Sequence, residues 1–268
     1  MDYNYKDIKE AFKRLGVEKK RIVMIRADLK YLGKYESDDK NETLKAYFDV
    51  LSDLVDLSEG TIVVPTTSTK LCNTDIPFDL ENTPSESGVI SEYIRKQSGS
   101  IRSFHPFMSY AAIGKEARGI CEDTARHAFG PETPKARMLE RDALCVSIGM
   151  PPHLTCTTIH HIEMIMGVPY RYSKEYSHPV VRNGEISCEC FYLYVWYKEC
   201  NLKRNHCVNI FNHFCQQGDK VTVAKLGRGK VYSYSMVEFY NSTIKLLRKD
   251  IYAWLDEIPK VKPYCRFM

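Results

Sequence analysis

The chain has 268 residues, of which 44% are hydrophobic and 27% charged, so it can bury a core without staples, and disorder and coiled coil are excluded. Its 38 basic and 34 acidic residues give a net charge of +4, too small an excess to indicate a nucleic-acid partner. No apolar run reaches about 18 residues, and the first residues do not resemble an export signal, so we expect a cytoplasmic protein with no membrane partner.

Short apolar strands alternate with amphipathic helices over the first 170 residues. The apolar spacing predicts helices over residues 6–16, 44–55, 116–126 and 157–166, and strands over residues 22–25, 61–64, 108–113 and 143–148. A further helix is predicted to begin at Thr83, because Thr83, Pro84 and Glu86 have the spacing of an N-cap, an N1 proline and a capping-box glutamate. This alternation favours an α/β fold, with a mixed central sheet and helices on both faces.

The pattern changes after about residue 170. Residues 188–197 are rich in aromatic side chains, which we interpret as a core strand and not as a stacking platform. The segments that follow predict a helix over 207–217, a strand pair at 220–223 and 230–234, and a long final helix over 237–255. Because no internal repeat or low-complexity linker divides the chain, residues 1–268 are predicted to form a single α/β domain with an elaborated carboxy-terminal part.

Ten cysteines are spread from Cys72 to Cys265. Disulfide frameworks belong to short secreted chains, so we expect free, buried thiols here. A zinc site could be assembled from Cys200, His206, Cys207, His213 and Cys215. Zinc modules, however, pair their ligands two to four residues apart and do so twice, which this cluster does not. No metal is therefore expected, and a zinc protein is kept as an alternative.

Fingerprints of nucleotide-binding folds and of α/β-hydrolases are absent. The sequence has no G-x-x-x-x-G-K-[ST], no G-x-G-x-x-G between a strand and a helix, and no G-x-S-x-G. Four polar segments remain near the ends of predicted strands, at 28–33, 65–69, 100–109 and 155–163. Ligands bind at the carboxyl ends of strands in open α/β sheets, so these segments form the candidate binding site.

The content and order of these segments resemble the aminoglycoside 3-N-acetyltransferase family. The resemblance spans about residues 20–255, and its motifs are G-T-I-V-V-P-T at 60–66, N-T-P-S at 82–85, R-S-F-H-P-F-M-S at 102–109, A-A-I-G at 111–114, F-G-P-E-T-P at 129–134 and T-T-I-H-H-I-E at 157–163. Members of the family transfer an acetyl group from acetyl-CoA to an amine on a sugar-like ring. The resemblance therefore implies acetyl-CoA as co-substrate and a small amino-sugar acceptor.

The resemblance also implies roles for single residues. His160, in Thr-x-His-x-x-Glu, is implied to be the catalytic base, and Glu163 lies one helical turn further on. A backbone N–H or a hydroxyl is expected to steady the thioester oxygen, and the candidate hydroxyls are those of Thr157 and Ser103. The residues that the family's loops place near acetyl-CoA are Asp28, Leu29, Leu32, Gly33, Thr66, Thr67, Arg102, Ser103 and His105.

A histidine suits the role of base for a physical reason. An amine with a pKa of about 10 is neutral in only about one molecule in a thousand at pH 7, and attack on a thioester needs the neutral form. A positioned base that titrates near neutrality contributes about 10²- to 10⁴-fold. On the predicted helix His160 lies about 60° from Glu163, near enough for the carboxylate to orient its ring. His161 lies about 160° from Glu163, so we expect it to be a packed or surface side chain.

Two of the cofactor assignments have competing interpretations. His105 is flanked by Phe104 and Pro106, which is equally typical of a core histidine. Arg102 could be a solvated charge. The first loop also departs from the family pattern, because Arg26-Ala27-Asp28 replaces a His-Ser-Ser-like turn and residues 34–40 replace a glycine-rich segment.

The charge balance bears on the acceptor. Several family members that modify antibiotics have a strongly acidic cleft for a polycation, whereas this chain is net basic. A basic chain favours an anionic ligand, so we predict acetylation of a nucleotide-linked or glycan-precursor amino sugar. The alternatives are an aminoglycoside-resistance enzyme and a catalytically idle protein that binds CoA or a sugar. The oligomeric state is left open, with a homodimer as the assembly considered.

Overall fold

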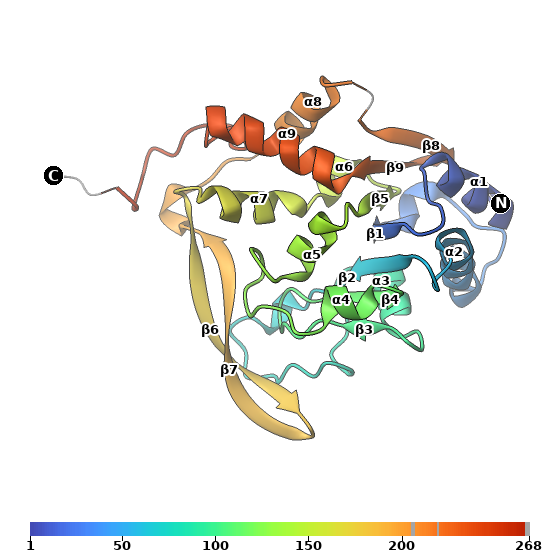
Figure 1. The fold of residues 1–268 in the computed structure, drawn as a ribbon, viewed down its shortest axis with the longest axis horizontal. Coiled ribbons are helices and arrows are strands. Elements are labelled where there is room, and N and C mark those ends of the chain that lie inside the picture. Colours follow the sequence, from blue (N-terminus) through green and yellow to red (C-terminus); the bar gives the residue numbers. More distant parts are fainter. Residues whose placement is uncertain (205–206, 219, 266–268) are drawn as a thin grey trace.

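A seven-stranded mixed sheet runs through the centre of the molecule (Figure 1). The computed structural model describes residues 1–204, 207–218 and 220–265. The strands lie in the order β3-β4-β2-β1-β5-β9-β8, and their bounds are Ile22–Ala27 (β1), Thr61–Pro65 (β2), Ile101–Arg102 (β3), Tyr110–Gly114 (β4), Leu144–Ile148 (β5), Thr222–Leu226 (β8) and Gly229–Ser235 (β9). Strand β1 is parallel to β2 and β5, while the other neighbours are antiparallel. The carboxyl ends of β1, β2 and β5 therefore meet at one edge of the sheet.

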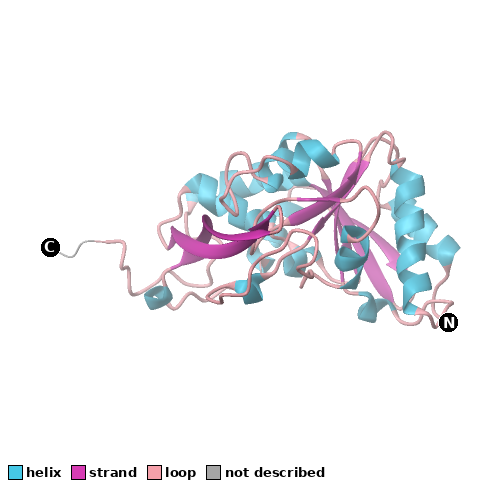
Figure 2. Cartoon of the chain, turned by 90° about the horizontal axis from the view of Figure 1, so that it is seen from below, coloured by secondary structure: helices cyan, strands magenta, loops and turns pink. Residues whose placement is uncertain are grey.

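Helices cover both faces of the sheet, which confirms the predicted fold class (Figure 2). One face carries α1 (Tyr5–Arg14), α2 (Lys40–Val55) and α3 (Val89–Arg95), and the other carries α4 (Ala117–Cys121), α5 (Pro134–Glu140), α7 (Thr158–Met166), α8 (Val208–Cys215) and α9 (Met236–Lys249). The short helix α6 (Pro152–Thr155) lies in the connection after β5. Alternate side chains of each strand fill the two cores, so that Val23 and Ile25 face one and Met24 the other.

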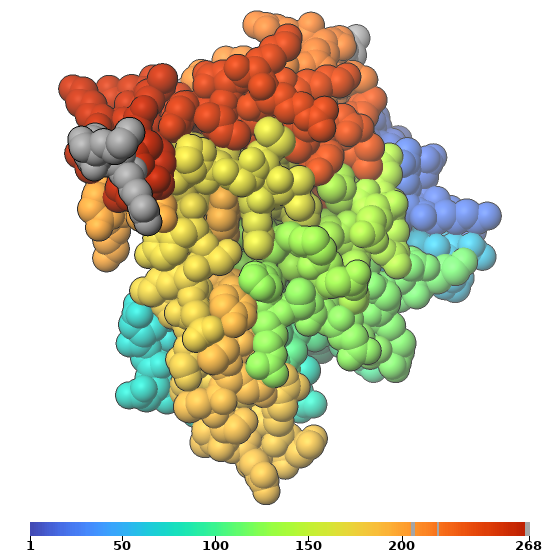
Figure 3. Space-filling model, turned by 60° about the vertical axis from the view of Figure 1, so that its left-hand side comes forward, coloured from blue at the N-terminus to red at the C-terminus, as the bar shows by residue number. Residues whose placement is uncertain are grey.

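A long β-hairpin lies apart from the central sheet (Figures 1 and 3). Its strands β6 (Arg171–Arg182) and β7 (Glu185–Trp196) pair along their whole length. The sequence predicted a core strand over 188–197, but Phe191 is the only buried residue of β7, so the prediction of a core strand is wrong. A two-stranded ribbon has no second sheet to cover it, and most of its aromatic side chains therefore keep contact with solvent.

Two helices begin or end away from their predicted limits. The helix predicted to start at Thr83 starts at Val89. The carboxylate of Glu86 accepts a hydrogen bond from the backbone N–H of Lys70, in a neighbouring loop, and makes no capping box in its own turn. The helix predicted over 116–126 ends at Cys121. The capping box predicted at Thr83 is therefore wrong, because Glu86 is bound by a neighbouring loop instead of by its own turn.

The chain after α9 folds back onto the protein. The final helix, predicted to run to Leu255, ends at Lys249, because Asp250 is extended and its side chain accepts a hydrogen bond from the backbone N–H of Tyr252. The segment that follows buries Trp254 in the core beneath α7. None of the described helices is long and apolar enough to cross a membrane.

Candidate active site

The first turn of α7 presents His160 at the candidate site. Thr157 precedes the helix, and Gly167, with a φ of +60°, ends it in the left-handed conformation. The imidazole of His160 lies between Phe129 and Trp254, whose ring centroids are 5.6 Å and 5.3 Å from its own. Its side chain is 23% exposed. The ring is thus held in place by two aromatic neighbours, and part of its surface stays exposed.

The carboxylate of Glu163 fixes the ring of His160. Glu163 Oε2 lies 3.0 Å from His160 Nδ1, and the Glu163 side chain is fully buried. A carboxylate only accepts hydrogen bonds, so this contact needs the ring proton on Nδ1 and leaves the lone pair of Nε2 free. The guanidinium of Arg171 lies 3.2 Å from the same Nδ1 but could donate only to the opposite tautomer. We assign the proton to Nδ1, because the contact with Glu163 is shorter and is strengthened by the carboxylate charge.

Arg171, the first residue of β6, completes this group, and the sequence did not single it out. Its Nε lies 2.9 Å from Glu163 Oε2, and its Nη1 donates to the carbonyl of Tyr194 at 2.9 Å. The guanidinium also packs against the rings of Trp196 and Trp254. The side chains of Arg171 and Glu163 are 3% and 0% exposed, so this ion pair is almost entirely shielded from water.

Burial lowers the pKa of His160 below its ordinary value of 6.5. The positive charges of Arg171 and Arg204 lower this pKa as well, whereas the hydrogen bond and charge of Glu163 raise it. Because burial and the two arginines prevail, the imidazole is neutral at pH 7 and can accept a proton. The sequence alone did not show how deeply the ring is packed, so it could not give the direction of this shift in pKa.

Two neighbours of His160 in the chain have partners of their own. Thr157 is half-buried, and its Oγ1 lies 3.3 Å from Nζ of Lys135. His161 is buried, and its Nδ1 accepts a hydrogen bond from the backbone N–H of Gly130 at 3.2 Å. His161 is therefore a packed side chain, in agreement with the sequence, while the role of Thr157 stays a prediction.

Three residues predicted to lie near acetyl-CoA come together near the carboxyl end of β2. Arg102 donates to the carbonyl of Thr66 at 2.9 Å and to the hydroxyl of Ser109 at 3.0 Å. The hydroxyl of Ser103 accepts from the backbone N–H of Tyr110 at 2.9 Å. Thr66, Arg102 and Ser103 are all buried, so the interpretation of Arg102 as a solvated charge is wrong. Arg102 holds the loops together, and contacts of this group with acetyl-CoA stay predictions.

Thr67 and His105 lie in the same group of loops. The hydroxyl oxygen of Thr67 is 2.7 Å from that of Ser87. Nδ1 of His105 accepts from the backbone N–H groups of Phe107 and Met108 at 3.2 Å and 3.1 Å, and the residue is 4% exposed. This burial supports the interpretation of His105 as a core histidine, and a contact with acetyl-CoA stays a prediction.

The segment after β1 forms a 3-10 turn that is capped by the side chain of Asp28. Leu32 is fully buried, and Leu29 packs against the same core. The carbonyl of Asp28 approaches Gly149 so closely that a side chain at position 149 would collide with it. This contact joins the ends of β1 and β5. The side chain of Leu32 therefore belongs to the core, while contacts of Asp28, Leu29 and Gly33 with acetyl-CoA stay predictions.

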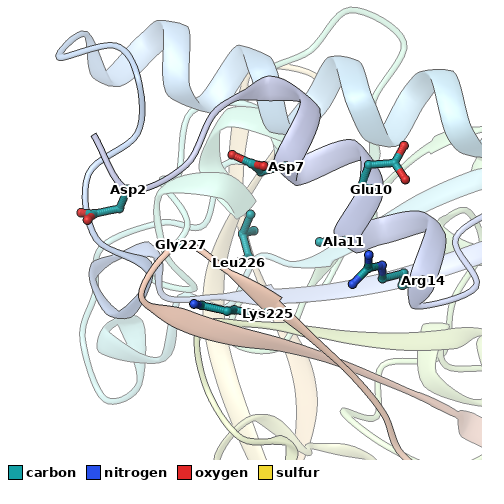
Figure 4. A pocket seen from close by; sticks show the side chains of 8 residues that line it. All are labelled: Asp2, Asp7, Glu10, Ala11, Arg14, Lys225, Leu226 and Gly227. Carbon is teal, nitrogen blue, oxygen red and sulfur yellow. The ribbon is translucent and has the colours of Figure 1, made fainter.

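Two of the cavities on the protein surface differ in whether they lie next to the His160 group. A cavity of about 370 Å³ opens along the hairpin, and its lining includes Arg171, Tyr172, Lys174, Tyr176, Tyr194 and Trp196. A second cavity, of about 270 Å³, lies between α1 and β8 and contains none of the predicted site residues; Figure 4 labels its lining, which is Asp2, Asp7, Glu10, Ala11, Arg14, Lys225, Leu226 and Gly227. Of the two, only the hairpin cavity shares a residue, Arg171, with the His160 group.

The structure describes all ten cysteines and four of the five residues of the candidate zinc cluster. All ten cysteines are free, as predicted, but only five of them are buried, so the prediction of burial is wrong for the other five. His206, which belonged to the candidate zinc cluster, lies outside the described residues. Within the described ranges, no group of three or more His, Cys, Asp or Glu side chains is placed to hold a metal ion.

Two buried histidines make the stability of the protein depend on pH. Burial lowers the pKa of both His105 and His161 from 6.5 to about 4. Between these pH values the unfolded chain binds protons that the folded protein does not, so stability falls as the pH is lowered from 6.5 towards 4. We expect the free energy of unfolding in urea to be smaller at pH 5 than at pH 7, by about 2 kcal/mol for each ring.

The control for this expectation is a residue without a titrating side chain. An Asn212→Ala variant, changed at an exposed position on α8, should keep the pH dependence of the wild type, whereas His161→Gln should weaken it. Equal free energies of unfolding at pH 5 and pH 7 in the wild type would contradict the expectation.

The sequence has relatives of known family. A family model described as aminoglycoside 3-N-acetyltransferase matches residues 24–248. Aminoglycoside N(3)-acetyltransferase IX of Micromonospora chalcea is 32% identical over 108 residues, which are 40% of this chain and 38% of that protein. Aminoglycoside N(3)-acetyltransferase III of a Salmonella species is 26% identical over 195 residues, 68% of each protein. The first of these matches therefore spans little more than a third of the relative's length.

Solved structures share the fold. The aminoglycoside acetyltransferase AAC(3)-IIb superposes with a TM-score of 0.79 over 92% of this chain and 97% of its own, at 19% identity. AAC-IIIb, in a binary complex with CoASH, has a TM-score of 0.78 over 92% and 96%, at 17% identity. AAC-VIa bound to sisomicin has a TM-score of 0.77 over 93% and 98%, at 20% identity. Because the family model matches most of its length, this chain belongs to the aminoglycoside 3-N-acetyltransferase family.

Proposed function

We propose that this protein transfers the acetyl group of acetyl-CoA to an amino group of a sugar-like acceptor, with His160 as general base. The observation that carries the proposal is the His160–Glu163 contact, which leaves Nε2 of a neutral and partly exposed imidazole free. Nε2 takes a proton from the acceptor nitrogen as this nitrogen bonds to the thioester carbon. The carbon–sulfur bond then breaks, and the CoA sulfur leaves and takes up the proton. The transfer is direct, with no acetylated side chain.

An aminoglycoside is the acceptor that the relatives support. The curated relatives are named for acetylation of aminoglycosides, and AAC-VIa has been solved with sisomicin bound. This support outweighs the argument from net charge, which favoured a nucleotide-linked or glycan-precursor amino sugar. We therefore take a polycationic amino sugar as the first acceptor to test.

An anionic amino sugar is the second candidate, because the surroundings of His160 are basic. Arg171 and Arg204 lie close enough to lower the pKa of His160. The hairpin cavity beside Arg171 is lined by three basic residues, Lys174 among them, and one acidic residue. These charges would repel a polycation and attract a phosphate-bearing sugar.

A coupled assay tests both candidates. Purified protein is expected to release CoA thiol from acetyl-CoA when sisomicin or a nucleotide-linked amino sugar is added, and the larger kcat/KM identifies the acceptor class. Susceptibility of cells with and without the gene gives an independent answer for the antibiotic. Binding of acetyl-CoA in calorimetry without thiol release for any acceptor would contradict the proposal and favour an idle binding protein.

The same assay tests whether the hairpin cavity receives the acceptor when the charge of one lining residue is reversed. A Lys174→Glu variant is expected to shift the ratio of kcat/KM between the polycationic and the anionic acceptor about 3- to 10-fold in favour of the polycation, and less so at high salt. Lys115→Glu is the matched control, because Lys115 pairs with Glu59 at the opposite edge of the sheet. An equal shift in both variants would show that the hairpin cavity does not receive the acceptor.

A further inference from the structure

Lys135 is a fully buried cation close to the candidate site. It lies on α5, which packs against α7 (Figure 1), and its side chain is 0% exposed. The ammonium lies 5.1 Å from the ring centroid of Tyr110. No ion pair of Lys135 occurs among the described residues. Burying an ammonium without an opposite charge is costly, and an apolar side chain would fill the same space at no such cost.

The ammonium of Lys135 is directed at Thr157. Nζ lies 3.3 Å from Thr157 Oγ1, and since an ammonium has donors only, the hydroxyl oxygen is the acceptor. The hydroxyl hydrogen of Thr157 is left to donate elsewhere. The side chain of Thr157 makes no cap for α7, and Thr157 is half-buried, so the hydroxyl is not used by the helix. It stands one turn before His160.

We propose that Lys135 is a positioning residue that acts through Thr157. By occupying the oxygen of the hydroxyl, it turns the hydroxyl hydrogen towards the carbonyl oxygen of the thioester, and its charge strengthens that donation as the oxygen becomes negative. When the acceptor nitrogen bonds to the carbonyl carbon, an electron pair moves onto this oxygen, and it returns when the carbon–sulfur bond breaks. Neither Thr157 nor Lys135 loses a proton. The assignment rests on the proposed acetyl transfer.

A double-mutant cycle tests the assignment. Thr157→Val is expected to lower kcat about 10²-fold and Lys135→Met about 10-fold, with little change in KM for acetyl-CoA. The double variant should be no slower than Thr157→Val alone, because Lys135 affects the reaction only through the hydroxyl of Thr157. Losses that multiply in the double variant, or an unchanged kcat in Lys135→Met, would overturn the assignment.

A spectroscopic readout separates this inference from the acetyl transfer itself. Infrared spectra of acetyl-CoA labelled with ¹³C in its carbonyl should show a lowered stretching frequency on binding to the wild type. The shift should be smaller in Lys135→Met and absent in Thr157→Val. If the wild type releases no thiol with any acceptor but the frequencies follow this order, the acetyl transfer fails and the positioning role stands. Frequencies that are equal in all three proteins, or no binding of acetyl-CoA, would overturn the positioning role.

Folding of the variants is checked in the same samples. Lys135→Met removes a buried charge and keeps the length of the side chain, so its urea-unfolding midpoint should be equal to or higher than that of the wild type. A variant that loses kcat while keeping this midpoint cannot owe its loss to unfolding. Thr157→Ser, which keeps the hydroxyl, should retain most of kcat and the lowered carbonyl frequency.

Discussion

Replacement of His160 by alanine is expected to lower kcat for acetyl transfer about 10²- to 10⁴-fold. The variant loses the only described group that we place as proton acceptor, while the loops proposed to hold acetyl-CoA are unchanged, so KM for acetyl-CoA should stay near that of the wild type. The remaining activity should rise about tenfold per pH unit up to the pKa of the acceptor amine, because water must then remove the proton before attack. Thiol release measured from pH 6 to 9 shows both effects.

The control for this variant is His213→Ala. His213 lies on α8, where its Nε2 is 2.9 Å from the side-chain amide of Gln217, away from the described contacts of His160. This variant should keep the wild-type kcat, and urea unfolding checks that both variants are folded under the conditions of the assay. Undiminished turnover by His160→Ala would remove His160 as the base and would leave the acetyl transfer itself standing.

Replacement of Arg171 by methionine is expected to cost about 3–5 kcal/mol of unfolding free energy, the largest effect on stability that we expect. The reason is that Glu163 would keep its buried carboxylate and lose the guanidinium that lies 2.9 Å away. A second substitution, Glu163→Gln, should restore part of the stability, because it removes the unpaired charge. Urea unfolding at pH 7 measures the unfolding free energy of the wild type, of Arg171→Met and of the double variant with Glu163→Gln.

A second arginine on the same hairpin serves as the matched control. Arg182 pairs with Glu189 at the far end of β6, and its side chain is 48% exposed. Because Glu189 keeps Arg126 as a partner, Arg182→Met should cost about 1 kcal/mol or less. If Arg171→Met costs no more than Arg182→Met, the buried ion pair is not what holds the hairpin to α7.

The central strands could be predicted from the sequence because they are buried on both faces. Residues 22–25, 61–64 and 143–148 are short, mostly apolar runs, and the strands lie within a few residues of these limits. Strand β6 could not be predicted, since only three of its twelve residues are buried and no apolar period appears. Its place is set by pairing with β7 along the whole hairpin, which a local pattern does not show.

Some residues of the candidate site could be predicted from their spacing in the sequence, and others are brought together only by the fold. His160 and Glu163 lie on one helix, so helical spacing alone predicted their contact. Arg171 could not be found, because the chain leaves α7 at Gly167 and reverses before β6 brings the guanidinium back. Lys135 was missed for a related reason, because a lysine in a helix is normally read as a solvated charge, and only the packing of α5 buries it.

The indole of Trp254 makes the candidate site depend on the segment after the last helix. It packs on both His160 and Arg171, yet it comes after the last helix and is joined to the rest by a few residues without regular structure. A nonsense codon just downstream of α9 would spare every strand of the sheet and all the polar groups of the site. The truncated product would still lack the cover that keeps water from the ion pair. Loss of the residues from Asp250 onward would therefore uncover the Arg171–Glu163 ion pair without removing any polar group of the site.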